Sequence, residues 1–296
     1  MDVERCWLRS SRCFYDLGPQ CQPITAMDQF AEFLKERLYL LNVSPATIVY
    51  YKCAFKAWQK HGNGDPKTWI VNMRQAGISP VSCNTYICAL NAYWKWAGES
   101  HHLKYLKEEE KVLATLSADQ VQRIIRFKPK GCNLSRAHLL ALLLLDTGLR
   151  FAEALNLRWE NIDLENLLVK VVGKGGKHRA VPISFEGRKA LFKWKQQSRF
   201  DHVFATRNGT LPTQRNVGRD FALLGERAGI QGVRFSPHTF RHTFAVSYLR
   251  AGGNVLYLQR ILGHSTLEMT SRYTRSLGTE DLQAVHDRFS LLGRKG

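Results

Sequence analysis

Apolar residues recur every three or four positions along most of this chain, which is the spacing of helices that bury one face. In the first hundred residues the pattern predicts helices at about Met27–Leu41, after Ser44-Pro45, from Pro66 and after Ser79-Pro80. A serine followed by proline is a helix-start signal, because the serine oxygen accepts a free backbone N–H and proline has no N–H to lose. We therefore expect a small helical bundle over residues 23–98.

A charged stretch, residues 99–116, separates this bundle from a second periodic region, residues 117–296. Ser117 and Gln120 have the spacing of a capping box at the start of a helix. The apolar run Leu139–Leu145 then predicts a buried helix that ends at Asp146-Thr147-Gly148. The sequence thus predicts a linker at 99–116 and a second domain after it.

Two runs in the second domain change to the alternating pattern of strands, Leu167–Val172 and Arg179–Ile183. The glycine- and lysine-rich segment Gly173–Lys177 joins them, which predicts a hairpin with a basic tip. Helical patterns then return, opened by Ser236-Pro237, by a Ser265–Glu268 capping box and from Thr279 to Leu292. The predicted fold class is mainly α with a small β-sheet.

Charge narrows the functional classes. The chain has 296 residues with 43 Lys+Arg against 25 Asp+Glu, a formal net charge of +18. Such a surplus is typical of proteins that bind nucleic acid, with acidic membrane surfaces as the alternative. Lys52, Lys56 and Lys60 lie four apart on one predicted helix face, so they are candidate contacts to a phosphate backbone.

The remaining composition excludes several classes. The longest apolar run is far shorter than a membrane-spanning helix, and residues 1–22 lack a secretory signal, so we expect a cytoplasmic protein with no membrane association. The cysteines number seven and form no C-x-x-C motif, which argues against disulfides or a metal cluster. Residues 1–22 show no periodicity and are expected to be a disordered extension.

Several polar residues of the second domain suit phosphoryl transfer. Arg150 and Arg241 could each hold a phosphate by paired, charge-assisted hydrogen bonds. His238 stands three residues before Arg241 at a predicted helix start, which favours anions. Tyr273 could act as a nucleophile, and a lysine at the hairpin tip could protonate a leaving oxygen. Taken singly, each has an ordinary structural interpretation, such as a core tyrosine or a surface ion pair between Arg150 and Glu153.

Together these residues resemble a known family. The motifs are TGLRFAE around Arg150, GKGGKHRAVPI around Lys174, HTFRH around His238 and Arg241, LGHS around His264, and SRYTR around Tyr273. Over residues 115–280 the chain resembles the tyrosine recombinases, the phage-integrase and Xer-like site-specific DNA recombinases. The helical segment 23–98 is similar, by pattern, to the family's core-binding domain, a SAM-like DNA-binding bundle.

The resemblance implies a role for each matched position. Arg150 and Arg241 would clamp the scissile phosphate, and His264 would donate a further hydrogen bond to it. Tyr273 would attack the phosphate, leaving a 3′-phosphotyrosyl link and a free 5′-hydroxyl. His238 would assist as the general base.

Further positions complete the implied site. Lys174 would protonate the departing 5′-oxygen, with Lys177 as the alternative, and Glu153 would support the site. Arg179 would contact DNA or pair locally. Because the phosphotyrosyl diester keeps the energy of the broken bond, we expect no metal and no cofactor. The final helix, with Leu282, Val285, Phe289 and Leu292 on one face, would pass to a neighbouring subunit in a tetramer on two double-stranded DNA sites.

Three alternatives remain open at this point. A type IB topoisomerase uses a similar tyrosine pocket without pairing DNA sites, and a catalytically silent DNA-binding protein could share the fold. His238 and His242 also have the spacing of a zinc-metalloprotease helix, although Thr239 stands where that helix would carry its glutamate.

Overall fold

The computed structural model describes residues 26–62, 64–109, 113–173, 176 and 178–290. It divides into two compact units, with the boundary between residues 110 and 111. The predicted extension, residues 1–22, lies outside the described residues. The fold is mostly helical with a small sheet, so the predicted fold class is confirmed.

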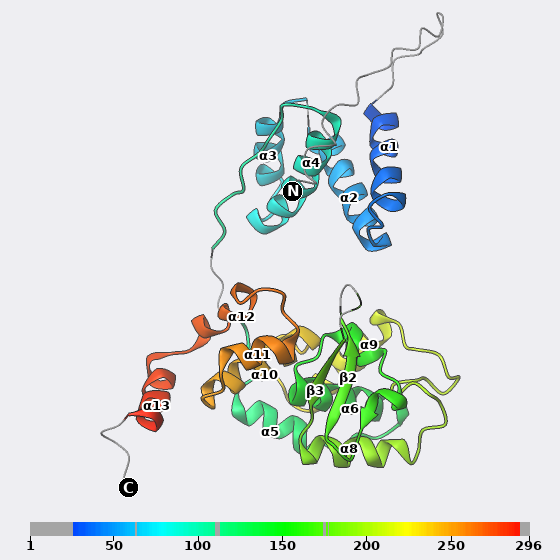
Figure 1. Ribbon diagram of the computed structural model, residues 1–296, viewed down its shortest axis with the longest axis vertical. Coiled ribbons are helices and arrows are strands. Elements are labelled where there is room, and N and C mark those ends of the chain that lie inside the picture. Colours follow the sequence, from blue (N-terminus) through cyan, green and yellow to red (C-terminus); the bar gives the residue numbers. More distant parts are fainter. Residues whose placement is uncertain (1–25, 63, 110–112, 174–175, 177, 291–296) are drawn as a thin grey trace, which may run out of the picture. The chain divides into compact units, whose positions relative to one another are not determined.

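The first unit is a helical bundle (Figure 1). Its helices are α1 (Ala26–Tyr39), α2 (Pro45–His61), α3 (Pro66–Gln75) and α4 (Pro80–Ala97). Ser44 and Ser79 cap α2 and α4 as predicted, each accepting a hydrogen bond from a backbone N–H three residues on. The core is rich in aromatic rings, with Phe30 stacked on Phe55 at 3.8 Å between centroids and Trp69 fully buried.

Part of the predicted linker packs on this unit. Leu103 is buried in its core, and Asn91 on α4 exchanges two hydrogen bonds with the Leu103 backbone. Asn84, two turns earlier on the same helix, does the same with Leu106. Residues 103–106 therefore follow α4 as a hydrogen-bonded strap.

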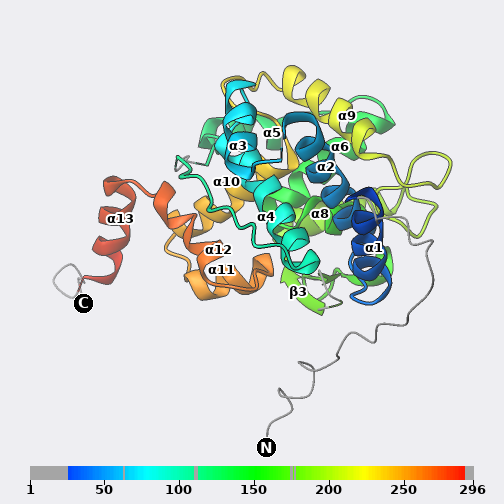
Figure 2. The same cartoon turned by 90° about the horizontal axis from the view of Figure 1, so that it is seen from above.

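The second unit surrounds one buried helix, α6 (Cys132–Thr147) (Figures 1 and 2). Around α6 pack α5 (Ala118–Arg126), α7 (Phe151–Leu155), α8 (Phe185–Lys195), α9 (Gln214–Arg227) and α10 (Pro237–Arg250). The chain ends with α11 (Val255–Leu262), α12 (Glu268–Ser271) and α13 (Thr279–Phe289). The Ser117 capping box and the Ser236 cap form as predicted. The predicted Ser265 capping box is wrong, because α12 begins only at Glu268 and Leu267 occupies its N-cap without a side-chain bond.

The sheet is antiparallel in the order β1 (Ile162–Asp163), β2 (Leu168–Val172) and β3 (His178–Pro182). Val171 pairs with Arg179 across the hairpin, so the hairpin prediction is confirmed, while β1 was not predicted. The register of the β2–β3 hairpin matters for the site, because it places Arg179 on β3 where its side chain reaches α11.

Candidate active site

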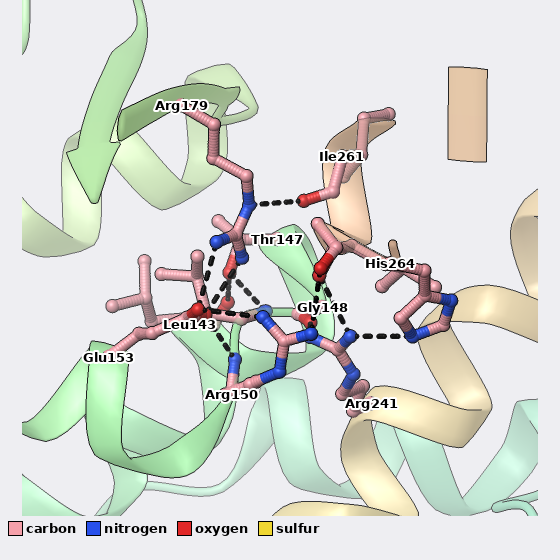
Figure 3. Close-up of polar contacts among 12 residues, drawn as sticks. Leu143, Thr147, Gly148, Arg150, Glu153, Arg179, Arg241, Ile261 and His264 are labelled. Atoms are coloured by element: carbon pink, nitrogen blue, oxygen red, sulfur yellow. Dashed lines mark hydrogen bonds and ion pairs between the residues drawn. The ribbon is translucent and has the colours of Figure 1, made fainter. Parts of the chain in front are cut away.

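Three consecutive carbonyl groups at the end of α11 each accept a hydrogen bond from a different arginine (Figure 3). Arg179 reaches Ile261 at 2.9 Å, Arg241 reaches Leu262 at 2.9 Å and Arg150 reaches Gly263 at 2.7 Å. The last carbonyls of a helix lack intrahelical partners and form the negative end of its dipole. The end of α11 therefore gathers guanidinium groups from β3, α10 and the α6–α7 turn.

Arg150 is placed by a sharp turn. Gly148 adopts the left-handed conformation (φ +62°), and a Cβ there would collide with Phe244. Arg150 then becomes the N-cap of α7, and the Glu153 carboxylate accepts from both its backbone N–H and its guanidinium, each at 2.9 Å. About a third of the Arg150 side chain (36%) stays exposed, so it remains accessible to a ligand.

Glu153 also binds Arg179. Both guanidinium NH groups of Arg179 donate to the two Glu153 oxygens at 2.8 Å. Burial acts to raise the pKa of this carboxyl, but the hydrogen bonds from Arg179 and from the Arg150 backbone outweigh burial and hold the pKa below its usual value. The sequence made Arg179 a candidate for DNA contact or local pairing. In the structure its guanidinium binds Glu153 and the end of α11.

Arg241 is buried among backbone carbonyls. It donates to Gly148 at 2.6 Å as well as to Leu262, and so bridges the C-terminal ends of α6 and α11. Burial lowers the pKa of Arg241 to about 10, an effect that the nearby Tyr273 opposes. The group stays cationic at neutral pH. The three guanidinium groups of Arg150, Arg179 and Arg241 against the single Glu153 carboxylate give a local charge of +2, which suits a bound phosphate.

His264 lies beside Arg241. The Arg241 guanidinium and His264 Nε2 are 2.9 Å apart, and since arginine can only donate, Nε2 is the acceptor. Nδ1 then carries the proton and donates to Thr270 at 2.8 Å. Burial and the surrounding arginines lower the pKa of His264 to about 4, so the ring is neutral at pH 7. Donation from His264 to a phosphate requires the proton on Nε2 instead, so that role stays a prediction.

Tyr273 lies next to His264 and His242 and is 2% exposed. Its ring is nearly parallel to the His264 ring, at 6.1 Å between centroids, and the Arg272 guanidinium lies 5.7 Å from its centroid. Its hydroxyl lies 3.4 Å from Nδ1 of His242. Burial, Arg272 and other nearby cations lower the pKa of His242 to about 4.

The structure brings together Arg150, Glu153, Arg241, His264 and Tyr273, which come from four motifs of the sequence. His238 is exposed and lies one turn before His242 on α10. Lys174 and Lys177 lie outside the described residues. Lys52, Lys56 and Lys60 are exposed along α2 in the other unit.

Sequence reasoning gave two residues no place in this site. His242 was considered only as a zinc ligand, and Thr270 was not singled out. The HTFRH motif places His242 next to Arg241, but nothing in the motif indicates which side chain meets Tyr273. Among the described residues no group of three metal-ligating side chains occurs, so the zinc interpretation finds no third ligand there. No described helix is long and apolar enough to cross a membrane.

Comparison with known proteins agrees with this geometry. The sequence model of the phage integrase family matches residues 114–280. The tyrosine recombinase XerA of Pyrococcus furiosus is 31% identical over 279 residues, which cover 90% of this chain and 94% of that protein. XerC of Xanthomonas campestris pv. campestris is 31% identical over 232 residues, 75% of this chain and 71% of that protein.

Solved structures share the fold. The integrase of transposon Tn1549, solved with circular intermediate DNA, aligns with a TM-score of 0.73 at 20% identity and covers 88% of this chain and 98% of its own. The XerA recombinase crystal structure aligns with a TM-score of 0.52 at 25% identity, covering 89% of this chain and 98% of that one.

The family model and the recombinase relatives together show the class of this protein, an enzyme that cleaves and rejoins DNA strands. The chain belongs to the phage integrase family of tyrosine recombinases, the site-specific enzymes that break and rejoin DNA. The topoisomerase and silent-protein alternatives are not favoured by these relatives.

Proposed function

We propose that Tyr273 is the nucleophile of this recombinase and that Arg150 and Arg241 hold the scissile phosphate. The observation that supports this proposal is the cluster at the end of α11, where Arg150 and Arg241 bind neighbouring carbonyl groups and Arg241 interacts with the buried Tyr273. The Tyr273 oxygen forms a bond to the phosphorus, the bond from phosphorus to the 5′-oxygen breaks, and Lys174 gives that oxygen its proton. A 5′-hydroxyl from another strand later reverses these steps.

The first test is covalent trapping. The full chain is incubated with nicked DNA that carries its own recombination site, taken from sequence flanking the gene, and resolved by denaturing electrophoresis. Wild type is expected to form a protein–DNA adduct, and Tyr273→Phe none. If wild type binds the site but forms no adduct, this assignment is wrong and a silent DNA-binding protein is the conclusion.

Lys174 is tested through its leaving group. Lys174→Ala should slow cleavage of ordinary DNA, typically by 10²–10⁴-fold for a lost general acid. A substrate with a 5′-thiolate leaving group, which needs no proton, should restore the rate. Rescue of Lys177→Ala in place of Lys174→Ala would assign the acid to Lys177.

For the assembly, we propose a tetramer on two double-stranded DNA sites, acting in the cytoplasm on a mobile element or replicon by integration, excision or resolution. The apolar side of α13 supports exchange of this helix between subunits, because Leu282 on that helix is 58% exposed. Removal of residues from Thr279 onward should leave binding to one site intact and abolish the tetramer, as measured by the mass of the complexes on DNA.

A further inference from the structure

We propose that His242, rather than His238, positions the Tyr273 hydroxyl and accepts its proton during strand cleavage. The inference rests on the proposed role of Tyr273 as nucleophile and concerns the partner of that hydroxyl. The two histidines lie one turn apart on α10 and line the same cleft. They differ in what they contact.

His242 makes the direct contact. Its Nδ1 lies 3.4 Å from the Tyr273 hydroxyl, and the ring centroids are 5.6 Å apart. His242 is half-buried, whereas His238 is exposed and forms no hydrogen bond or ion pair with the described residues. A general base must be within hydrogen-bond reach of the proton that it removes.

The other groups around Tyr273 cannot take the proton. Arg241 and Arg272 are cationic donors without an acceptor atom. Both ring nitrogens of His264 are engaged, Nε2 with Arg241 and Nδ1 with Thr270. Within the described part of the chain, Nδ1 of His242 is thus the neutral acceptor next to this hydroxyl.

The charges around His242 connect this role to DNA binding. The groups that face it are Arg241 and His238 on α10 and Arg272 and Tyr273 from the α12 end. The positive ones disfavour a proton on the free ring. A phosphate held at Arg150 and Arg241 counters that charge, so His242 becomes a better acceptor when substrate is in place. In cleavage the proton passes from the Tyr273 oxygen to Nδ1 as the oxygen–phosphorus bond forms, and in rejoining it returns.

Cleavage rates on nicked DNA give the first test. His242→Ala should lose about 10²-fold or more in adduct formation. In His242→Asn the amide oxygen can lie near the Nδ1 position, so the variant should still bind the hydroxyl but not accept its proton. Its rate of adduct formation should therefore lie between those of wild type and His242→Ala. Ser247→Ala, at an exposed position of the same helix, is the control and should match wild type.

An acidified nucleophile separates proton acceptance from folding. Fluorinated tyrosine at position 273 has a lower phenol pKa and depends less on a base. It should reduce the deficit of His242→Ala by about tenfold or more, whereas a merely structural defect would persist. If His238→Ala shows the larger loss and the selective rescue, the inference is overturned.

A measurement on the free protein does not depend on activity. Imidazole ¹⁵N NMR of the full chain should show Nδ1 of His242 unprotonated at pH 7, with a resonance that shifts in Tyr273→Phe. A His242 resonance that is protonated at Nδ1, or unchanged in Tyr273→Phe, contradicts the inference. Failure of wild type to form an adduct would instead refute the proposed nucleophile, so the two failures are distinguishable.

Discussion

Among the described residues, Glu153 is the carboxylate that connects two of the arginines of the site. It accepts hydrogen bonds from Arg150 and Arg179 while only 7% of its side chain is exposed. Removal of one member of a buried charge network destabilises the fold, because the remaining charges are left buried without a partner. The acidic position that the family resemblance implied as a support is thus a structural hub of the arginine cluster.

Glu153→Gln should lower the free energy of unfolding by about 3 kcal/mol at pH 7. Because the folded-state pKa of Glu153 is lowered, its contribution is present above the unfolded-state pKa and is lost as pH falls through the folded one. The variant and wild type should therefore converge in urea unfolding as pH drops below about 4. Glu186→Gln, which breaks an exposed pair with Lys189, is the control and should cost under about 1 kcal/mol. An equal loss in both variants would contradict the central role of Glu153.

Gly263, whose carbonyl accepts a hydrogen bond from Arg150, also has a backbone conformation and surroundings that favour glycine. It has φ +65°, and a Cβ there would lie 2.9 Å from the Arg179 guanidinium. Gly263→Ala should therefore both strain the backbone, by roughly 1–2 kcal/mol, and displace Arg179 from Glu153. Gly232→Ala is a matched control, since Gly232 has φ +77° with nothing within 4 Å of the Cβ position. Only Gly263→Ala should also reduce adduct formation on nicked DNA.

At the scale of elements, local signals predicted much of the fold. Serine caps, the Ser117 capping box and the alternating hairpin runs are read within a few residues, so they predicted α2, α4, α5, α10 and the β2–β3 hairpin. The end of α11 was not predictable in this way. Arg179 and Ile261 are 82 residues apart in the chain, and nothing in either local pattern indicates their hydrogen bond. The family motifs contain the side chains that the structure brings together, but they do not indicate the carbonyl groups that hold the arginines there.

The strap along α4 gives a prediction at this scale. Asn91→Ala should remove both hydrogen bonds to Leu103 and leave its backbone groups without those partners, at a cost of about 1–3 kcal/mol. Amide exchange at Leu103 should rise strongly while exchange in α2 changes little. Thr85→Ala, on the same helix, removes one exposed hydrogen bond and is the control. Equal exchange in both variants would mean that Asn91 does not hold the strap.

For the whole molecule, the net charge of +18 predicts that DNA affinity depends strongly on salt concentration. Binding that neutralises phosphates releases counterions, so affinity falls with salt at a slope of about −0.9 for each phosphate neutralised. The exposed row of Lys52, Lys56 and Lys60 on α2 is a candidate for such contacts. If all three contact phosphates, their loss should lower the slope by nearly three and weaken binding to all DNA sequences alike.

The test compares two triple variants with the same change in net charge. Lys52, Lys56 and Lys60 are replaced by glutamine in one, and Lys189, Lys193 and Lys195 of α8 in the other. Wild type and the α8 variant should share the steeper dependence of log Kd on log salt, and the α2 variant should show the shallower one. Equal slopes in both variants would mean that the protein's total charge, and not the α2 row, governs its affinity. A loss that depends on DNA sequence would indicate contacts to bases, because phosphate contacts carry no direct sequence information.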